Sequence, residues 1–76
     1  MKHLLISIVK SLVDHPSKVI VTQIDGAKTV VFELRCDEQD VGKIIGKNGK
    51  TISSIRTLLG ALASKERRKV IIEVVD

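Results

Sequence analysis

Aromatic side chains are almost absent from this chain. Its 76 residues include one phenylalanine, no tyrosine and no tryptophan. Domains that hold nucleic-acid bases by stacking them depend on exposed aromatic rings. The composition therefore argues against an aromatic stacking platform.

Cysteine and long apolar runs are also scarce. Cys36 is the single cysteine, so no internal disulfide can form, and no Cys/His cluster has the spacing of zinc ligands. No segment approaches the roughly 20 apolar residues that a membrane-spanning helix needs. We therefore expect a cytoplasmic protein with no membrane association, no metal and no cofactor.

The length of the chain limits its domain organisation. Chains of 76 residues bury only about 60% of their unfolded surface when they fold. Apolar residues make up 43% of the sequence, and most of them are isoleucine, valine and leucine, which suffices for one core. Because no linker, repeat or low-complexity segment interrupts the pattern, residues 1–76 are predicted to form a single domain.

Positive charge is concentrated in one part of the sequence. The net charge is +4, yet residues 43–69 contain eight basic residues and one acidic residue, whereas the other residues contain five basic and eight acidic ones. Such clustering is typical of an anion-binding region, and a solvated basic face is the alternative. The same segment contains a glycine-rich loop, which favours anion binding.

The first half of the chain predicts a helix followed by a β-hairpin. Apolar residues recur at helical spacing over residues 2–14, and Pro16 ends that helix. Residues 18–24 are β-branched and predict a strand, and residues 27–36 alternate as its partner. The Asp-Gly pair at 25–26 predicts a two-residue type I′ turn, which needs positive φ at both central positions.

The second half predicts two helices and a last strand. Residues 37–45 predict a short helix that Asp37 caps and Gly46 closes in the left-handed conformation. Residues 50–64 predict a longer helix, and residues 70–75 a buried strand parallel to its neighbour. The order α-β-β-α-α-β indicates an α+β fold, with a three-stranded mixed sheet packed against three helices.

The stretch "GKIIGKNGKT", residues 42–51, contains three glycines and three lysines. A P-loop would need a glycine where Ile44 stands, and a dinucleotide fingerprint would need G-x-G-x-x-G after a strand. Neither pattern is present, and the preceding element is predicted to be helical. Nucleotide-binding enzymes of both kinds are therefore excluded.

A G-x-x-G loop between two helices suits a sugar-phosphate backbone instead. Glycines without Cβ atoms let the ligand approach the main chain, and the following helix directs amide groups and its positive dipole end at phosphate. Lys47 and Lys50 add charge, and Asn48 can donate hydrogen bonds. Neighbouring isoleucines could form an apolar floor for bases, although the same residues could belong to the core.

The run "VGKIIGKNGKTISSIRTLL" resembles the core signature of the KH domain, and the helix and hairpin ahead of it resemble the type II arrangement. The resemblance covers essentially the whole chain and is greatest to the KhpA-like family of small stand-alone bacterial KH proteins. It implies binding of single-stranded RNA in a cleft between two helices, with the G-x-x-G loop at one lip and the sheet edge opposite. Carried over to this chain, the resemblance implies an RNA-binding set of Gly42, Lys43, Ile44, Ile45, Gly46, Lys47, Asn48, Gly49, Lys50, Ile52 and Arg56.

The other wall of that cleft is expected to come from the strand that carries Phe32, Leu34 and Arg35. Whether Arg67, Arg68 and Lys69 touch RNA stays open, because they could be a solvated connection. No paired carboxylates or nucleophile–base pair can be assembled, so an enzyme and a small-molecule substrate are not expected.

The family resemblance also implies partners. It implies a homodimer, or a heterodimer with a larger KH-containing RNA-binding protein, and a role as an RNA chaperone or post-transcriptional regulator. A dimerisation or adaptor module that mainly recruits a protein, and a ribosome-assembly factor, remain as alternatives.

Overall fold

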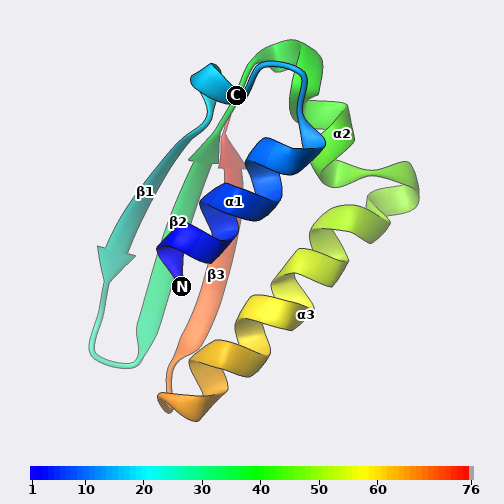
Figure 1. The fold of residues 1–76 in the computed structure, drawn as a ribbon. Coiled ribbons are helices and arrows are strands. Elements are labelled where there is room, and N and C mark those ends of the chain that lie inside the picture. The colour runs from blue at the N-terminus through cyan, green and yellow to red at the C-terminus, as the bar shows by residue number, and fades with distance from the viewer. Residues whose placement is uncertain (76) are drawn as a thin grey trace.

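The computed structural model describes residues 1–75, in which three helices lie over one face of a three-stranded sheet (Figure 1). The elements are α1 (Lys2–Leu12), β1 (Ile20–Asp25), β2 (Thr29–Arg35), α2 (Val41–Ile45), α3 (Lys50–Lys65) and β3 (Lys69–Val75). Short 3₁₀ turns occupy Pro16–Lys18, Glu38–Asp40 and Lys47–Gly49. The predicted order and the α+β class are confirmed.

Helix α1 ends at Leu12, two residues before its predicted end at residue 14. The backbone amides of Asp14 and His15 donate to the carboxylate of Asp40, at 3.2 and 3.0 Å, and not to helical carbonyls. The end of α1 is therefore determined by the side chain of Asp40, 25 residues beyond His15, which local periodicity does not reveal.

The predicted type I′ turn at residues 25–26 is wrong. Strand β1 continues through Asp25, which pairs with Val30, and the amide of Gly26 donates to the carbonyl of Thr29 at 2.7 Å. Gly26 does not adopt positive φ. An ion pair between Asp25 and Arg68 helps to hold Asp25 in the strand, and a Cβ on Gly26 would lie 3.2 Å from the Thr29 carbonyl oxygen. Glycine at this position allows the backbone of residue 26 to lie close to the backbone of Thr29 across the hairpin.

Strand β2 lies at the centre of the sheet, antiparallel to β1 and parallel to β3. The parallel pairing was predicted, because two helices connect β2 to β3. Val30, Phe32 and Leu34 point from β2 into the core and are fully buried, as the alternation predicted, whereas Cys36 is half-buried at its margin. Leu5 and Val9 of α1 complete that side of the core.

The predicted helix over residues 37–45 is divided into a 3₁₀ turn and the five-residue α2. Asp37 caps this segment as predicted, since its carboxylate accepts the amide of Gln39 at 2.9 Å. Asp40, which separates the two parts, is buried and its carboxylate contacts the α1–β1 connection. The sequence pattern predicted neither the division of this helix nor the burial of the Asp40 side chain.

Helix α3 buries Ile52, Ile55, Leu59 and Ala63 along one face and ends at Lys65, one residue later than predicted. The amides of Arg67 and Arg68 then return to the carbonyls of Ser64 and Ala63, at 3.0 and 2.9 Å. This is the hydrogen-bond pattern that ends many helices on a glycine with positive φ. Here Arg67 occupies that position with φ of 57°.

Candidate nucleic-acid interface

The loop between α2 and α3 has a backbone that requires glycine at its first position. Gly46 has φ of 76° and ψ of 174°, so its φ is positive as predicted, but its ψ is extended and not left-handed helical. That region of the φ/ψ map is essentially restricted to glycine. A Cβ on Gly46 would also lie 2.1 Å from Oγ1 of Thr51. The loop therefore folds tightly against the first turn of α3.

The next residues continue the same unusual backbone. Asn48 and Gly49 adopt left-handed conformations with φ of 57° and 73°, and the amide of Gly49 donates to the carbonyl of Gly46 at 3.1 Å. No described side chain caps the amides at the start of α3. A 16-residue helix thus begins on an uncapped, glycine-bounded turn, an arrangement that suits an anion.

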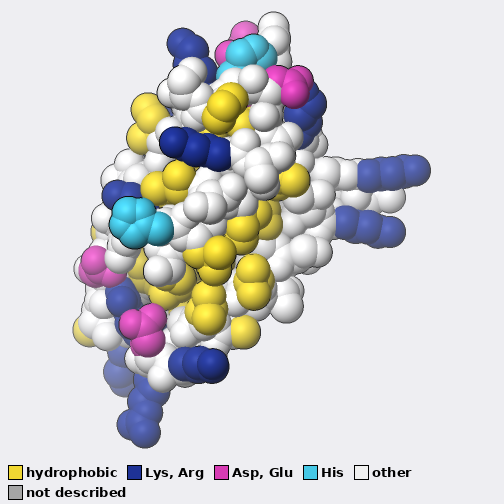
Figure 2. Space-filling view, viewed as in Figure 1, with side chains coloured by type: hydrophobic (Ala, Val, Ile, Leu, Met, Phe, Trp, Pro, Cys, Tyr) yellow, Lys and Arg dark blue, Asp and Glu magenta, His cyan; other side chains and the backbone are white. Residues whose placement is uncertain are grey.

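Charge on the loop is exposed and unneutralised. Lys47, Asn48 and Lys50 are exposed, and none of them makes an ion pair or side-chain hydrogen bond to another residue within 1–75. Figure 2 shows basic side chains projecting into solvent at the edge of the molecule where the α2–α3 loop lies in Figure 1. These residues can meet phosphates without first breaking internal contacts.

Lys43 differs from the loop lysines. Its ammonium group pairs with the carboxylate of Asp14 and lies 3.5 Å from the carboxylate of Asp40. The hydrogen bond to Asp14 raises the pKa of Lys43 above its ordinary value, against a smaller opposing effect of burial. The structure therefore directs this charge toward the α1–β1 connection, although the sequence grouped Lys43 with the RNA-binding residues.

The isoleucines of the predicted binding set divide into core and surface. Ile44 is 0% exposed and Ile52 is 5% exposed, and both pack in the core beneath the loop. Ile45 is 38% exposed and extends into solvent. Gly42 is exposed on the same short helix, and a Cβ there would meet no described atom within 4 Å beyond its own stretch of chain. Of these positions, Ile45 and Gly42 offer an accessible surface.

The sheet edge beside α3 is β3, so the prediction that Phe32 and Leu34 of β2 supply the opposite wall is wrong, whereas Arg35 at the end of β2 is exposed. Strand β2 is central, and its Phe32 and Leu34 are fully buried. Arg56 on α3 donates to the backbone carbonyl of Ile72 on β3 at 2.9 Å. The parallel crossover places β3 on the far side of β2 from β1, and this makes β3 an edge.

Residues 1–75 enclose no pocket, so this candidate interface is an open surface. Within the same range, no three His, Cys, Asp or Glu side chains are placed to hold a metal ion. No helix of the described chain is both long and apolar enough to cross a membrane. A ligand on this surface would meet backbone amides, lysine ammonium groups and aliphatic side chains.

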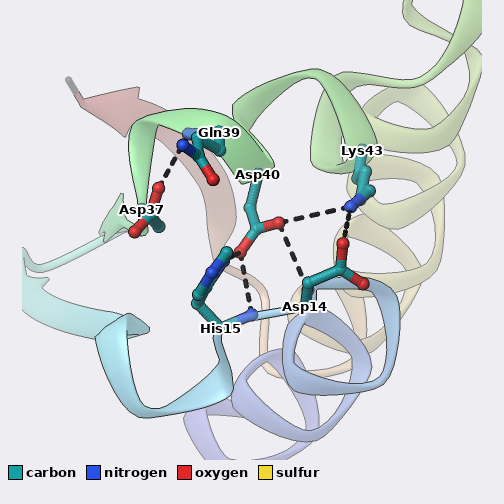
Figure 3. A network of polar contacts seen from close by, with 6 residues as sticks. All are labelled: Asp14, His15, Asp37, Gln39, Asp40 and Lys43. Atoms are coloured by element: carbon teal, nitrogen blue, oxygen red, sulfur yellow. Dashed lines mark hydrogen bonds and ion pairs between the residues drawn. The ribbon is translucent and has the colours of Figure 1, made fainter.

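Sequence reasoning missed the polar contacts behind α2. Asp40, His15 and Asp14 form a cluster with Lys43 (Figure 3). The sequence places Asp40 near the start of a helix and gives no sign that its side chain is buried. The sequence shows only that the backbone amides just before Pro16 need hydrogen-bond acceptors. It does not identify the residue that supplies those acceptors.

A mixed sheet covered by three helices, with a G-x-x-G loop between the second and third helices, defines a type II KH domain. The sequence matches the family described as KhpA/KhpB, KH domain, over residues 2–74. It is 46% identical to the RNA-binding protein KhpA of Chlamydia muridarum over 76 residues, covering 100% of this chain and 97% of that protein. It is 51% identical to the RNA-binding protein KhpA of Borreliella burgdorferi over 69 residues, covering 91% and 84%.

A third relative is the RNA-binding protein KhpA of Clostridium acetobutylicum, with 43% identity over 75 residues, 99% of this chain and 100% of that protein. No solved structure matches the chain significantly. The chain belongs to the KhpA/KhpB family of KH domains.

Proposed function

We propose that this protein binds single-stranded RNA without catalysing a reaction. The observation that carries the proposal is the loop of residues 46–49, in which three positive-φ residues and the unpaired Lys47 precede the uncapped start of α3 at Lys50. The relatives bear the name RNA-binding protein, which supports RNA as the ligand. Residues 1–75 enclose no pocket, so a bound strand would lie along an open surface.

The proposed contacts divide into backbone and base contacts. Residues 46–49 and Lys50 hold phosphates through amide groups and ammonium charge. Ile45 and the open surface at Gly42 meet the bases, and Ile44 and Ile52 support that surface from the core. The β3 edge and Arg56 provide hydrogen-bonding groups for base edges on the other side. Lys43 is omitted from the direct contacts, because its charge is already paired.

The expected affinity is weak and salt-dependent. Two or three neutralised phosphates correspond to a log–log salt slope of about −1.4 to −2, at ~0.7 per phosphate for single strands. A short site of this kind gains useful affinity when two copies act together. A dimeric protein would supply two such sites.

Exposed apolar side chains on the helical face support the proposal that a protein partner binds there. Leu4 and Leu12 on α1 and Leu58 on α3 are large apolar residues that remain exposed. Figure 2 shows apolar side chains over the face on which α1 and α3 lie. We propose that this face forms a homodimer, or a heterodimer with a larger KH-containing RNA-binding protein, in a cytoplasmic chaperone or regulatory role. The alternative is an adaptor in which protein recruitment dominates and RNA contact is secondary.

Fluorescence anisotropy with short single-stranded RNAs tests the RNA proposal. The variant Lys47→Asp/Asn48→Asp should lose binding, because it replaces phosphate contacts with repulsion on a loop that exposes both side chains. The matched control is Ser17→Asp/Lys18→Asp in the exposed 3₁₀ turn Pro16–Lys18, which makes the same total change of charge at a place remote in sequence from the loop. Equal binding by the wild type and both variants would reject the loop as the binding site and favour the adaptor alternative.

A further inference from the structure

A buried carboxylate connects the start of α2, the helix before the loop, to the connection between α1 and β1. Asp40 is 0% exposed, the one charged or polar side chain in residues 1–75 to be buried. Its carboxylate accepts the amides of Asp14 and His15, at 3.2 and 3.0 Å, and a third contact of 3.0 Å from Nδ1 of His15 (Figure 3). The ammonium of Lys43 lies 3.5 Å away.

These groups come from two segments that are distant in sequence. Asp14 and His15 belong to the connection between α1 and β1, whereas Asp40 immediately precedes α2 and Lys43 lies within it. Lys43 adds a second bridge, because its ammonium also pairs with Asp14. The carboxylate and the ammonium together fix the start of α2 to the end of α1.

Helix α2 needs such a fixing point. It has five residues, and isolated helices shorter than about 12 residues are marginal in water. Ile44 anchors it in the core, and the loop starts at the next residue but one, where the amide of Gly46 donates to the carbonyl of Gly42 at 2.9 Å. A tilt of α2 would therefore displace Gly46, and with it the backbone groups of the loop.

The burial of the Asp40 carboxylate also indicates that it fixes the relative position of two segments. A buried carboxylate is costly to desolvate, and a well-packed apolar side chain is often at least as stabilising at such a position. The hydrogen bonds to Asp40 have fixed directions, and they join two segments that no regular secondary structure connects. We propose that Asp40, supported by His15 and Lys43, is a positioning residue that holds α2 and the 46–49 loop in the conformation that binds RNA. The effect on RNA binding rests on the proposed function. The effect on the conformation of α2 and the loop can be measured without RNA.

Asp40→Asn is the central test, because it keeps the size of the side chain but removes the charge and one of the two acceptor oxygens. Amide hydrogen exchange in the folded variant should become faster in residues 41–50 than in β2 and β3. RNA affinity, corrected for the folded fraction, should fall roughly three- to tenfold as the binding-competent population falls to about a third or a tenth. A purely structural role would instead lower global stability and leave the affinity of the folded protein unchanged.

The matched control is Asp37→Asn, which makes the same chemical change at the start of the same 3₁₀ turn. Asp37 accepts a local amide and makes no hydrogen bond or ion pair to α1 within residues 1–75, and asparagine is also a good cap. It should leave both exchange and affinity close to the wild type. Equal loop exchange and affinity in Asp40→Asn and wild type would overturn the proposal.

His15→Ala is the milder variant to use if Asp40→Asn does not fold. The His15 side chain is 43% exposed, so its loss removes one contact to Asp40 but leaves both backbone amides in place. Selective acceleration of exchange in residues 41–50 supports positioning, and unchanged exchange rejects it. Absence of RNA binding by the wild type would reject the proposed function alone, because the exchange experiment would still decide the positioning of the loop.

Discussion

Gly46 and Thr51 are packed so closely that a Cβ on Gly46 would lie 2.1 Å from Oγ1 and 2.6 Å from Cβ of Thr51. The glycine also has φ of 76° with ψ of 174°. Space and backbone conformation thus give two independent reasons for glycine at this position. The second glycine of the loop has only one, because Gly49 is left-handed but has no described atom near its hypothetical Cβ.

Gly46→Ala should therefore be more damaging than Gly49→Ala. We expect a loss of about 1–3 kcal/mol in the free energy of unfolding from backbone strain at Gly46, increased by the contact with Thr51. Gly49→Ala should cost about 1 kcal/mol, the ordinary penalty of a left-handed alanine. Urea unfolding of the two variants checks the order, and equal losses would contradict the packing argument.

Gly42→Ala should separate stability from binding. Gly42 lies within α2 without positive φ, and its hypothetical Cβ points into open space. Alanine at such a position is expected to stabilise the fold by about 0.5–1 kcal/mol. If RNA lies against α2, the added methyl group should lower affinity in the same variant. Thermal unfolding and anisotropy measure the two effects, and unchanged affinity would place the RNA away from this surface.

The sequence predicted the helices, strands and loop well because these depend on local periodicity and on glycine. The alternation that buries Val30, Phe32 and Leu34 is a property of one strand, and Gly46 has the positive φ that was predicted for it. The hairpin turn was misplaced because the Asp25–Arg68 ion pair and the close approach of Gly26 to Thr29 depend on other parts of the chain.

Long-range contacts also explain the errors within the candidate site. Lys43 and Lys47 each follow a glycine in the sequence, yet only Lys43 has Asp14 within reach. That difference depends on where α1 ends, which is itself determined by Asp40. The wall opposite the loop was assigned to β2 for a similar reason, since only the crossover geometry reveals that β3 is the edge.

Arg67→Gly should stabilise the protein. Arg67 has φ of 57° at the end of α3, in the position where glycine is usually found. Relief of the left-handed strain should raise the free energy of unfolding by up to about 1 kcal/mol. Arg67→Ala removes the same charge but keeps the strain, so it should give no comparable gain. Equal stabilisation by both variants would attribute the effect to charge.

Asp40 should make the stability of the protein sensitive to acid. Burial alone would raise the pKa of Asp40, but the hydrogen bonds from the Asp14 amide and from His15 outweigh it and lower the pKa below its ordinary value of 3.8. A carboxyl group with a lowered folded-state pKa contributes stability above the unfolded value, and this contribution is lost as pH falls through the folded value. Urea unfolding of wild type and Asp40→Asn should therefore differ most above about pH 5 and converge in stronger acid. A constant difference across that range would contradict the assignment.

The two kinds of lysine should be distinguishable by the salt dependence of RNA binding. Lys47→Met removes an unpaired charge from the loop, so the log–log salt slope should become shallower by about 0.7. Lys43→Met removes a charge that is already paired with Asp14, so the slope should stay that of the wild type while affinity falls by a similar factor at every salt concentration. Anisotropy titrations at four or more salt concentrations between about 50 and 200 mM would distinguish a shallower slope from an unchanged one. A shallower slope for Lys43→Met would mean that Lys43 leaves Asp14 to contact phosphate, and would return it to the binding surface.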